Sequence, residues 1–163
     1  MPESDDTVRI ARRRFGRGGN GLQNLARRLG CPATTAHRAL ATEDLDFVIF
    51  LGDYIYEGAP NPTALRQHDG VGEPYTLDDY RGRHARYRSD LDLQAAHAAF
   101  PWFVTLDDHE IDNNWASDTP EEGMPQEYHF RRRKAAFRAY WEHMPLRKAQ
   151  RPTADGIQIY KRC

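Results

Sequence analysis

The chain has 163 residues, a length that suits one domain with a sizeable core. Its formal net charge at pH 7 is −1, which gives no reason to expect a nucleic-acid or membrane partner for the whole protein. Two cysteines, Cys31 and Cys163, are too few for a disulfide framework and form no CxxC zinc motif. The sequence contains no apolar run long enough to span a membrane.

The N-terminal part of the chain has an unusual charge pattern. Residues 7–42 contain no Asp or Glu but include eight arginines, Arg9, Arg12, Arg13, Arg14, Arg17, Arg27, Arg28 and Arg38. Such a segment is either a solvated basic region or an arm that binds nucleic acid or anionic surfaces. The run Arg12–Phe15 resembles a twin-arginine export signal, but no hydrophobic core follows it. We therefore predict no working signal peptide and leave the localisation open.

The most informative stretch is DFVIFLGDYIYE, residues 46–57. The apolar run Phe47–Leu51 predicts a strand buried on both faces, as in a parallel sheet covered by helices. Gly52 allows the backbone to turn. Asp53 then places a carboxylate at the carboxyl end of the strand, where open α/β sheets bind their ligands.

A second stretch, FPWFVTLDDHE at 100–110, repeats this pattern. Trp102–Leu106 predicts another short buried strand, and Asp107, Asp108, His109 and Glu110 follow it directly. Two buried strands that both end in hard oxygen ligands predict a metal site at one edge of the sheet.

Helical patterns separate these strands. Thr76 and Asp79 predict a capping box at the start of one helix. Residues 58–75 are rich in Gly and Pro and predict a long loop of the kind that often serves as a functional lid. The other expected helices cover 33–43, 90–100 and 125–144, and further strands are expected at 157–160 and at 7–11. This order predicts an α/β fold with a small sheet.

The long helix at 125–144 carries one apolar stripe. Phe130, Phe137, Trp141 and Met144 recur at helical spacing, and Arg131–Lys134 are expected to face mainly water. Five histidines on predicted helices are expected to be structural or exposed and not metal ligands, namely His37, His84, His97, His129 and His143.

Several residues at the strand ends are candidate ligands. Asp53 and Tyr56 could place a carboxylate and a phenolate on one cation, although an Asp after a strand is equally typical of a turn and a Tyr of ordinary packing. Asp108 could bind a metal through oxygen, and His109 could bind the metal or stabilise charge at the reacting group. A solvated loop is the alternative for these charged side chains. Further oxygen ligands are available in Asp112, Asn113 and Asn114. Carboxylates and amides suit calcium, magnesium or manganese, whereas the tyrosine indicates iron.

Three stretches together resemble the PhoD-type alkaline phosphatase/phosphodiesterase family of calcineurin-like metallophosphatases. They are LGDYIYE at 51–57, the segment 80–114 that ends in LDDHEIDNN, and RRKAAFRAYWEHMPLR at 132–147. The resemblance runs from about Ala36 to Tyr160. It implies a four-layer α/β/β/α sandwich, hydrolysis of phosphate monoesters and diesters, and export from the cytoplasm.

The same resemblance implies roles for individual residues. Asp53 would bridge two metals, Tyr56 would bind iron, and Asp108 and Asn113 would bind calcium. His109 would act beside the substrate phosphate, so His109 and Asp108 are the expected catalytic residues. Iron and calcium are the implied cofactors, with other divalent metals as alternatives, and a phosphate ester is the implied substrate. The oligomeric state is not indicated.

The chain departs from the family pattern in two ways. The family has a Ser-Cys motif whose cysteine binds iron after a strand like residues 8–11, and Cys31 does not stand in such a context. We therefore treat residues 1–35 as an atypical segment, either disordered or frame-shifted, with 12–35 as the hypothesised frame-shifted part. The family's later histidine and aspartate ligands also have no counterpart within 36–163. We thus expect an incomplete sheet and weak or absent activity for this chain alone.

Overall fold

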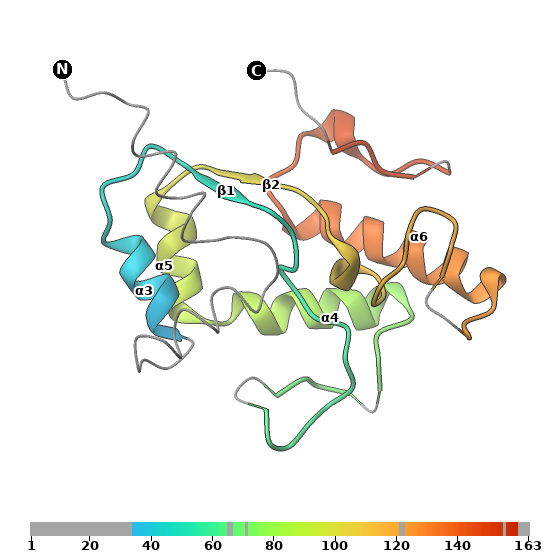
Figure 1. Cartoon of the computed structure of the whole chain (residues 1–163). Helices are drawn as coiled ribbons and strands as arrows, with labels where there is room; N and C mark the ends of the chain where they lie inside the picture. The colour runs from blue at the N-terminus through green and yellow to red at the C-terminus, as the bar shows by residue number, and fades with distance from the viewer. Residues whose placement is uncertain (1–33, 65–66, 71, 121–122, 155, 160–163) are drawn as a thin grey trace.

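The computed structural model describes residues 34–64, 67–70, 72–120, 123–154 and 156–159. The strand expected at 7–11, Cys31 and nearly all of the Arg-rich segment lie outside these ranges. In the described part, the order of elements follows the predicted alternation of helices and strands (Figure 1). The elements are α3 (Thr34–Ala41), β1 (Val48–Phe50), α4 (Leu77–Arg88), α5 (Leu91–Ala99), β2 (Trp102–Val104), η1 (Asp108–Glu110), α6 (Gln126–His143) and η2 (Lys148–Gln150).

The two strands form a small parallel sheet. Val48 pairs with Trp102 and Phe50 with Val104. The helices α4 and α5 connect β1 to β2, as expected for a parallel pair that needs a crossover connection. Helix α3 packs on α5, and α4 packs on α6 (Figure 1). The described chain is therefore a mixed α/β structure with a small, incomplete parallel sheet, as predicted.

Only one face of this sheet is fully covered. Val48, Phe50, Trp102 and Val104 are buried in the core. On the opposite face Phe103 is 39% exposed and packs edge-to-face on Phe47, with ring centroids 5.4 Å apart. The prediction of a strand buried on both faces is therefore wrong for the described residues. An unbroken apolar run cannot show how much of the second face is covered.

The helix boundaries agree well with the sequence patterns. Helix α4 begins after Thr76, whose side chain accepts from the Asp79 backbone N–H while Asp79 bonds back to the Thr76 backbone. This is the predicted capping box. The strand expected at 157–160 is not present over 157–159, which make no ladder. Alternation of side chains is not sufficient when no neighbouring strand supplies the hydrogen bonds.

The buried stripe of α6 differs from the predicted one. Phe137 and Met144 are buried, but Phe130 is 41% exposed beneath the Arg133 guanidinium, 5.1 Å from the ring centroid. Arg132, expected to face water, is only 2% exposed. Hydrophobic periodicity missed Arg132 because its burial depends on a charged partner distant in the sequence, Asp112.

Candidate metal centre

The turn after β1 brings Asp53 to the end of the sheet. Gly52 has φ of +99° and Asp53 has φ of +56°, so two successive residues adopt left-handed backbone conformations. Gly52 permits a close approach to the end of β2, since a Cβ there would lie 2.5 Å from the Cβ of Asp107. The chain thus turns next to the segment that follows β2, as the Gly-Asp pattern predicted.

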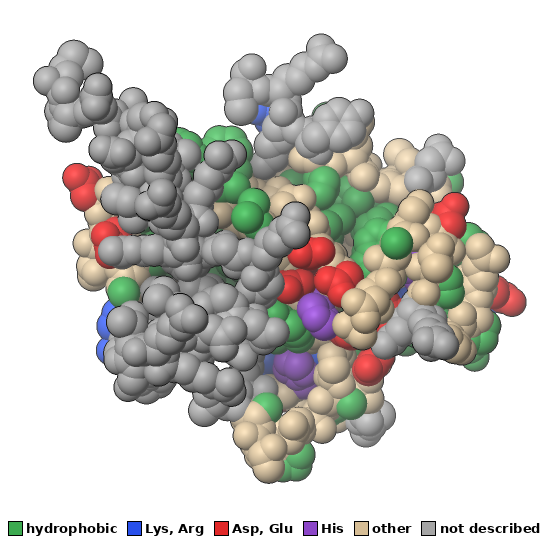
Figure 2. All heavy atoms as spheres, viewed as in Figure 1, with side chains coloured by type: hydrophobic (Ala, Val, Ile, Leu, Met, Phe, Trp, Pro, Cys, Tyr) green, Lys and Arg blue, Asp and Glu red, His purple; other side chains and the backbone are tan. Residues whose placement is uncertain are grey.

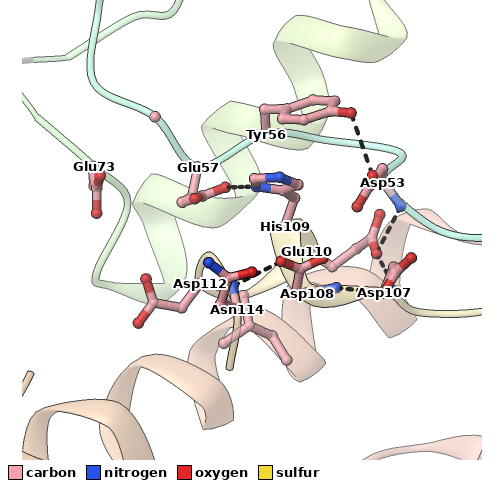
Figure 3. Close-up of polar contacts among 12 residues, drawn as sticks. Asp53, Tyr56, Glu57, Glu73, Asp107, Asp108, His109, Glu110, Asp112 and Asn114 are labelled. Carbon is pink, nitrogen blue, oxygen red and sulfur yellow. Dashed lines mark hydrogen bonds and ion pairs between the residues drawn. The ribbon is translucent and has the colours of Figure 1, made fainter. Parts of the chain in front are cut away.

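Glu110 joins the two strand ends. Its fully buried carboxylate accepts the backbone N–H of Asp53 at 3.1 Å and that of Asp107 at 2.7 Å (Figure 3). It also accepts the backbone N–H of Tyr54. One side chain therefore fixes the turn after β1 against the segment after β2. The sequence patterns did not predict this role for Glu110. The signal was present, because Asp107 and Glu110 form a capping box around η1.

The predicted ligand residues lie together at this edge. Asp53, Asp108 and His109 each offer one ligand atom, and these atoms lie within 4.8 Å of one another. The Tyr56 hydroxyl donates to Oδ2 of Asp53 at 3.3 Å. Acidic and histidine side chains also gather at the surface near the centre of Figure 2. We name Asp53, Tyr56, Asp108 and His109 the strand-end cluster.

The other candidate ligands have different positions. Asp112 is buried, and its Oδ1 forms an ion pair with Nη1 of Arg132 at 2.7 Å, so its role as a ligand stays a prediction. The backbone N–H of Asn114, not its side chain, donates to Asp108 Oδ2 at 2.7 Å (Figure 3). Asn113 lies half-buried in the same turn, and its role as a ligand stays a prediction.

A buried carboxylate supports His109. Oε2 of Glu57 lies 2.7 Å from Nδ1 of His109, and the Tyr56 ring packs on the imidazole with centroids 4.5 Å apart. The contact of Glu57 was not predicted, because nothing in the local pattern of 51–57 connects this residue to one after the second strand.

Electrostatic shifts in the cluster reflect burial and crowded negative charge. The hydrogen bond that His109 donates to Glu57 raises the pKa of His109 to about 9, although burial opposes the shift. Burial, followed by the charge of Asp53, raises the pKa values of Tyr56 and Asp107. Burial also raises the pKa of Glu110 to about 8, against the effect of its backbone donors. A bound cation would oppose the repulsion among these groups.

Two helices hold the segments that carry the cluster. Arg132 of α6 contacts Asp112 and the hydroxyl of Tyr80, which in turn donates to the Ile111 carbonyl. Arg132 also reaches Glu73, at 3.1 Å, near the end of the loop 58–75. In its described part this loop is held further by Arg86, which donates to the Gln67 carbonyl. These contacts anchor the loop, and its role as a lid stays a prediction.

The family described as PhoD-like phosphatase matches residues 26–163. This chain belongs to the PhoD-like phosphatase family. It is 52% identical over 132 residues to alkaline phosphatase D of Bacillus subtilis (strain 168), covering 78% of this chain. It also resembles a solved structure of PhoD, with a TM-score of 0.74 and 52% identity over 78% of this chain.

The family match confirms the resemblance inferred from the three sequence stretches. The chain spans 22% of the length of the curated relative and 25% of the solved PhoD chain. The described region therefore corresponds to one part of a PhoD-like phosphatase. Among the described residues, no helix is both long and apolar enough to cross a membrane.

Proposed function

We propose that this PhoD-like chain contributes to a metal-dependent centre that hydrolyses phosphate monoesters and diesters. The observation that carries the proposal is the convergence of Asp53, Asp108 and His109, with ligand atoms within 4.8 Å, at the ends of two parallel strands. Family membership supports the phosphoesterase chemistry. We further propose that the fold belongs to the four-layer α/β/β/α sandwich class, to which the described sheet contributes two strands.

The donor set fits a hard cation. Two carboxylates, a phenol and an imidazole are ligands suited to iron, calcium or another divalent metal. Asp53 would hold the metals, with Tyr56 on iron and with Asp108 and Asn113 on calcium. When bound, such a cation would polarise the phosphate and lower the pKa of a bound water.

The protein side chains would have separate roles at this centre. His109 would lie beside the phosphate, where a protonated imidazole can donate to an oxygen that gains negative charge. Asp108 accepts the Asn114 backbone N–H, and this hydrogen bond would keep its carboxylate oriented toward the bound metal and phosphate. Glu110 would hold the turn after β1 against the segment after β2 through its backbone donors.

Metal analysis tests the centre directly. We expect the purified chain to retain iron and calcium after desalting, and Asp53→Asn to lose them. Asp46→Asn is the matched control, because Asp46 is an exposed carboxylate at the start of the same segment. Equal metal content in all three proteins would contradict the proposed centre.

A turnover assay tests the chemistry. A metal ion of this kind takes about six oxygen or nitrogen ligands, more than the strand-end cluster supplies. We therefore propose that this chain alone hydrolyses para-nitrophenyl phosphate weakly or not at all with added iron and calcium. Robust turnover by the purified chain would refute the expectation of weak activity. Phosphate-sensitive metal binding without turnover would support the incomplete centre.

A further inference from the structure

Arg83 of α4 lies directly behind the chain segment that carries Glu57. Its guanidinium is buried, and Nη1 donates to the carbonyl of Gly58 at 3.0 Å and to that of Tyr56. These carbonyls belong to the two residues on either side of Glu57. A single planar, permanently charged group therefore fixes the backbone on both sides of this carboxylate.

Glu57 is 5% exposed and makes a defined contact with His109. Its Oε2 lies 2.7 Å from Nδ1 (Figure 3). An ionised carboxylate only accepts hydrogen bonds, so Nδ1 must carry the proton. The Tyr56 ring, 4.5 Å away, limits rotation of the imidazole on one side. The tautomer and the orientation of the ring are thus both determined by neighbours of known position.

We propose that Glu57, supported by Arg83, is the positioning residue that presents Nε2 of His109 to Asp53, Asp108 and a phosphate oxygen bound beside them. This inference deepens the proposed function and rests on it. Both roles considered for His109 use the same atom. A neutral imidazole with the proton on Nδ1 offers the Nε2 lone pair to a metal, and an imidazolium offers Nε2–H to phosphate.

The competing explanation is that Glu57 and His109 only tie two segments of the chain together. The two explanations differ in what the loss of the acceptor changes: a tie predicts lower folding stability, whereas an orienting role predicts loss of the Nδ1–H signal in a protein that is still stably folded. Glu57→Gln keeps an amide oxygen that can accept from Nδ1–H, whereas Glu57→Ala removes every acceptor. If Glu57 acts by orienting the ring, Glu57→Gln restores most of the effect that is lost in Glu57→Ala.

Nuclear magnetic resonance of the histidine side chains in the purified chain provides the direct test. We expect a slowly exchanging Nδ1–H signal that disappears in His109→Gln, which assigns it. Glu57→Gln should retain the signal, Glu57→Ala should lose it, and Arg83→Met should speed its exchange by about tenfold or more. Glu127→Ala, which removes an exposed carboxylate on α6, is the control and should change nothing. Thermal unfolding of each variant identifies any that fail to fold.

Two results of the resonance measurement would contradict the positioning role of Glu57. A His109 ring protonated only at Nε2 in the unmodified chain, or an Nδ1–H signal that survives in folded Glu57→Ala, would overturn the proposal. Where turnover is measurable, Glu57→Ala should lower kcat by about tenfold or more with little change in KM, and Glu57→Gln should recover most of it. Absence of turnover in all proteins is the result expected of the incomplete centre, and loss of the metal-binding difference in Asp53→Asn would count against the proposed function alone. The resonance measurement decides the positioning role independently of both.

Discussion

The backbone of Gly52 lies against Asp107, so closely that a Cβ on Gly52 would come within 2.5 Å of the Cβ of Asp107. This contact joins the turn after β1 to the segment after β2. It requires a residue without a side chain at a backbone φ of +99°. The arrangement of the strand-end cluster therefore depends on a glycine as well as on the ligand residues.

Gly52→Ala is expected to lower the free energy of unfolding by about 3 kcal/mol or more, because it adds both backbone strain and a steric overlap. Gly82→Ala is the matched control. Gly82 is exposed within α4 and a Cβ there meets no atom within 4 Å, so alanine should stabilise the protein by about 0.5–1 kcal/mol. Urea denaturation measures the free energy of unfolding of both variants. Similar changes in the two would contradict the steric overlap expected at Gly52.

Glu110→Gln tests the buried carboxylate that joins the strand ends. A glutamine side chain has one acceptor oxygen and places N–H donors where backbone N–H groups already point, so some of the three donors lose their partner. We expect a loss of about 2–3 kcal/mol in the free energy of unfolding. Glu127→Gln, at an exposed position of α6, should change it by less than about 0.5 kcal/mol. A neutral result for Glu110→Gln would mean that the strand ends are held by other contacts.

Arg132→Met tests the ion pair beneath the cluster. Removing the guanidinium leaves the carboxylate of Asp112 buried without its cation, which should cost about 3–5 kcal/mol in folding free energy. The exposed neighbour pair Arg131–Glu127 provides a control, because Arg131→Met should cost less than about 1 kcal/mol. Adding Asp112→Asn to Arg132→Met should restore part of the loss. A double variant no more stable than Arg132→Met would argue against an uncompensated charge.

His84 predicts a pH dependence of stability. Burial lowers the pKa of this fully buried ring to about 3, with the positive charges of His143 and Arg88 acting in the same direction. Its ring also stacks on His143, at 5.0 Å between centroids, and lies near the rings of Tyr54 and Tyr140. Because only the unfolded state binds a proton as the pH falls below 6.5, acid favours unfolding.

We expect this single group to lower the free energy of unfolding by about 2 kcal/mol between neutral pH and pH 5. The contribution is fully present above the unfolded pKa and is lost as the pH falls toward the folded value. His84→Phe keeps an aromatic ring but cannot bind a proton, so its stability should fall less over the same range. Parallel pH profiles of the two proteins, measured by denaturant unfolding, would contradict the assignment to His84.

Local patterns were enough to predict much of the fold. The apolar runs before Gly52 and before Asp107 identified both strands, and the Thr76–Asp79 capping box identified the start of α4. The placement of Asp53 and Asp108 at one edge followed from the parallel order of the strands. These features depend on neighbours along the chain, which a sequence displays directly. The same local reasoning failed for 157–159, where a strand would need a partner.

The sequence by itself therefore determined the family, the two strands, and the carboxylates, tyrosine and histidine at their ends. Tertiary structure alone decided how these groups are supported. Glu57 meets His109 across 52 residues of sequence, and Glu110 meets the Asp53 backbone across 57. Arg132 is buried only because Asp112 lies opposite it. The favourable energy of such contacts arises from desolvated charges brought together by packing, and no local periodicity encodes which charges will meet.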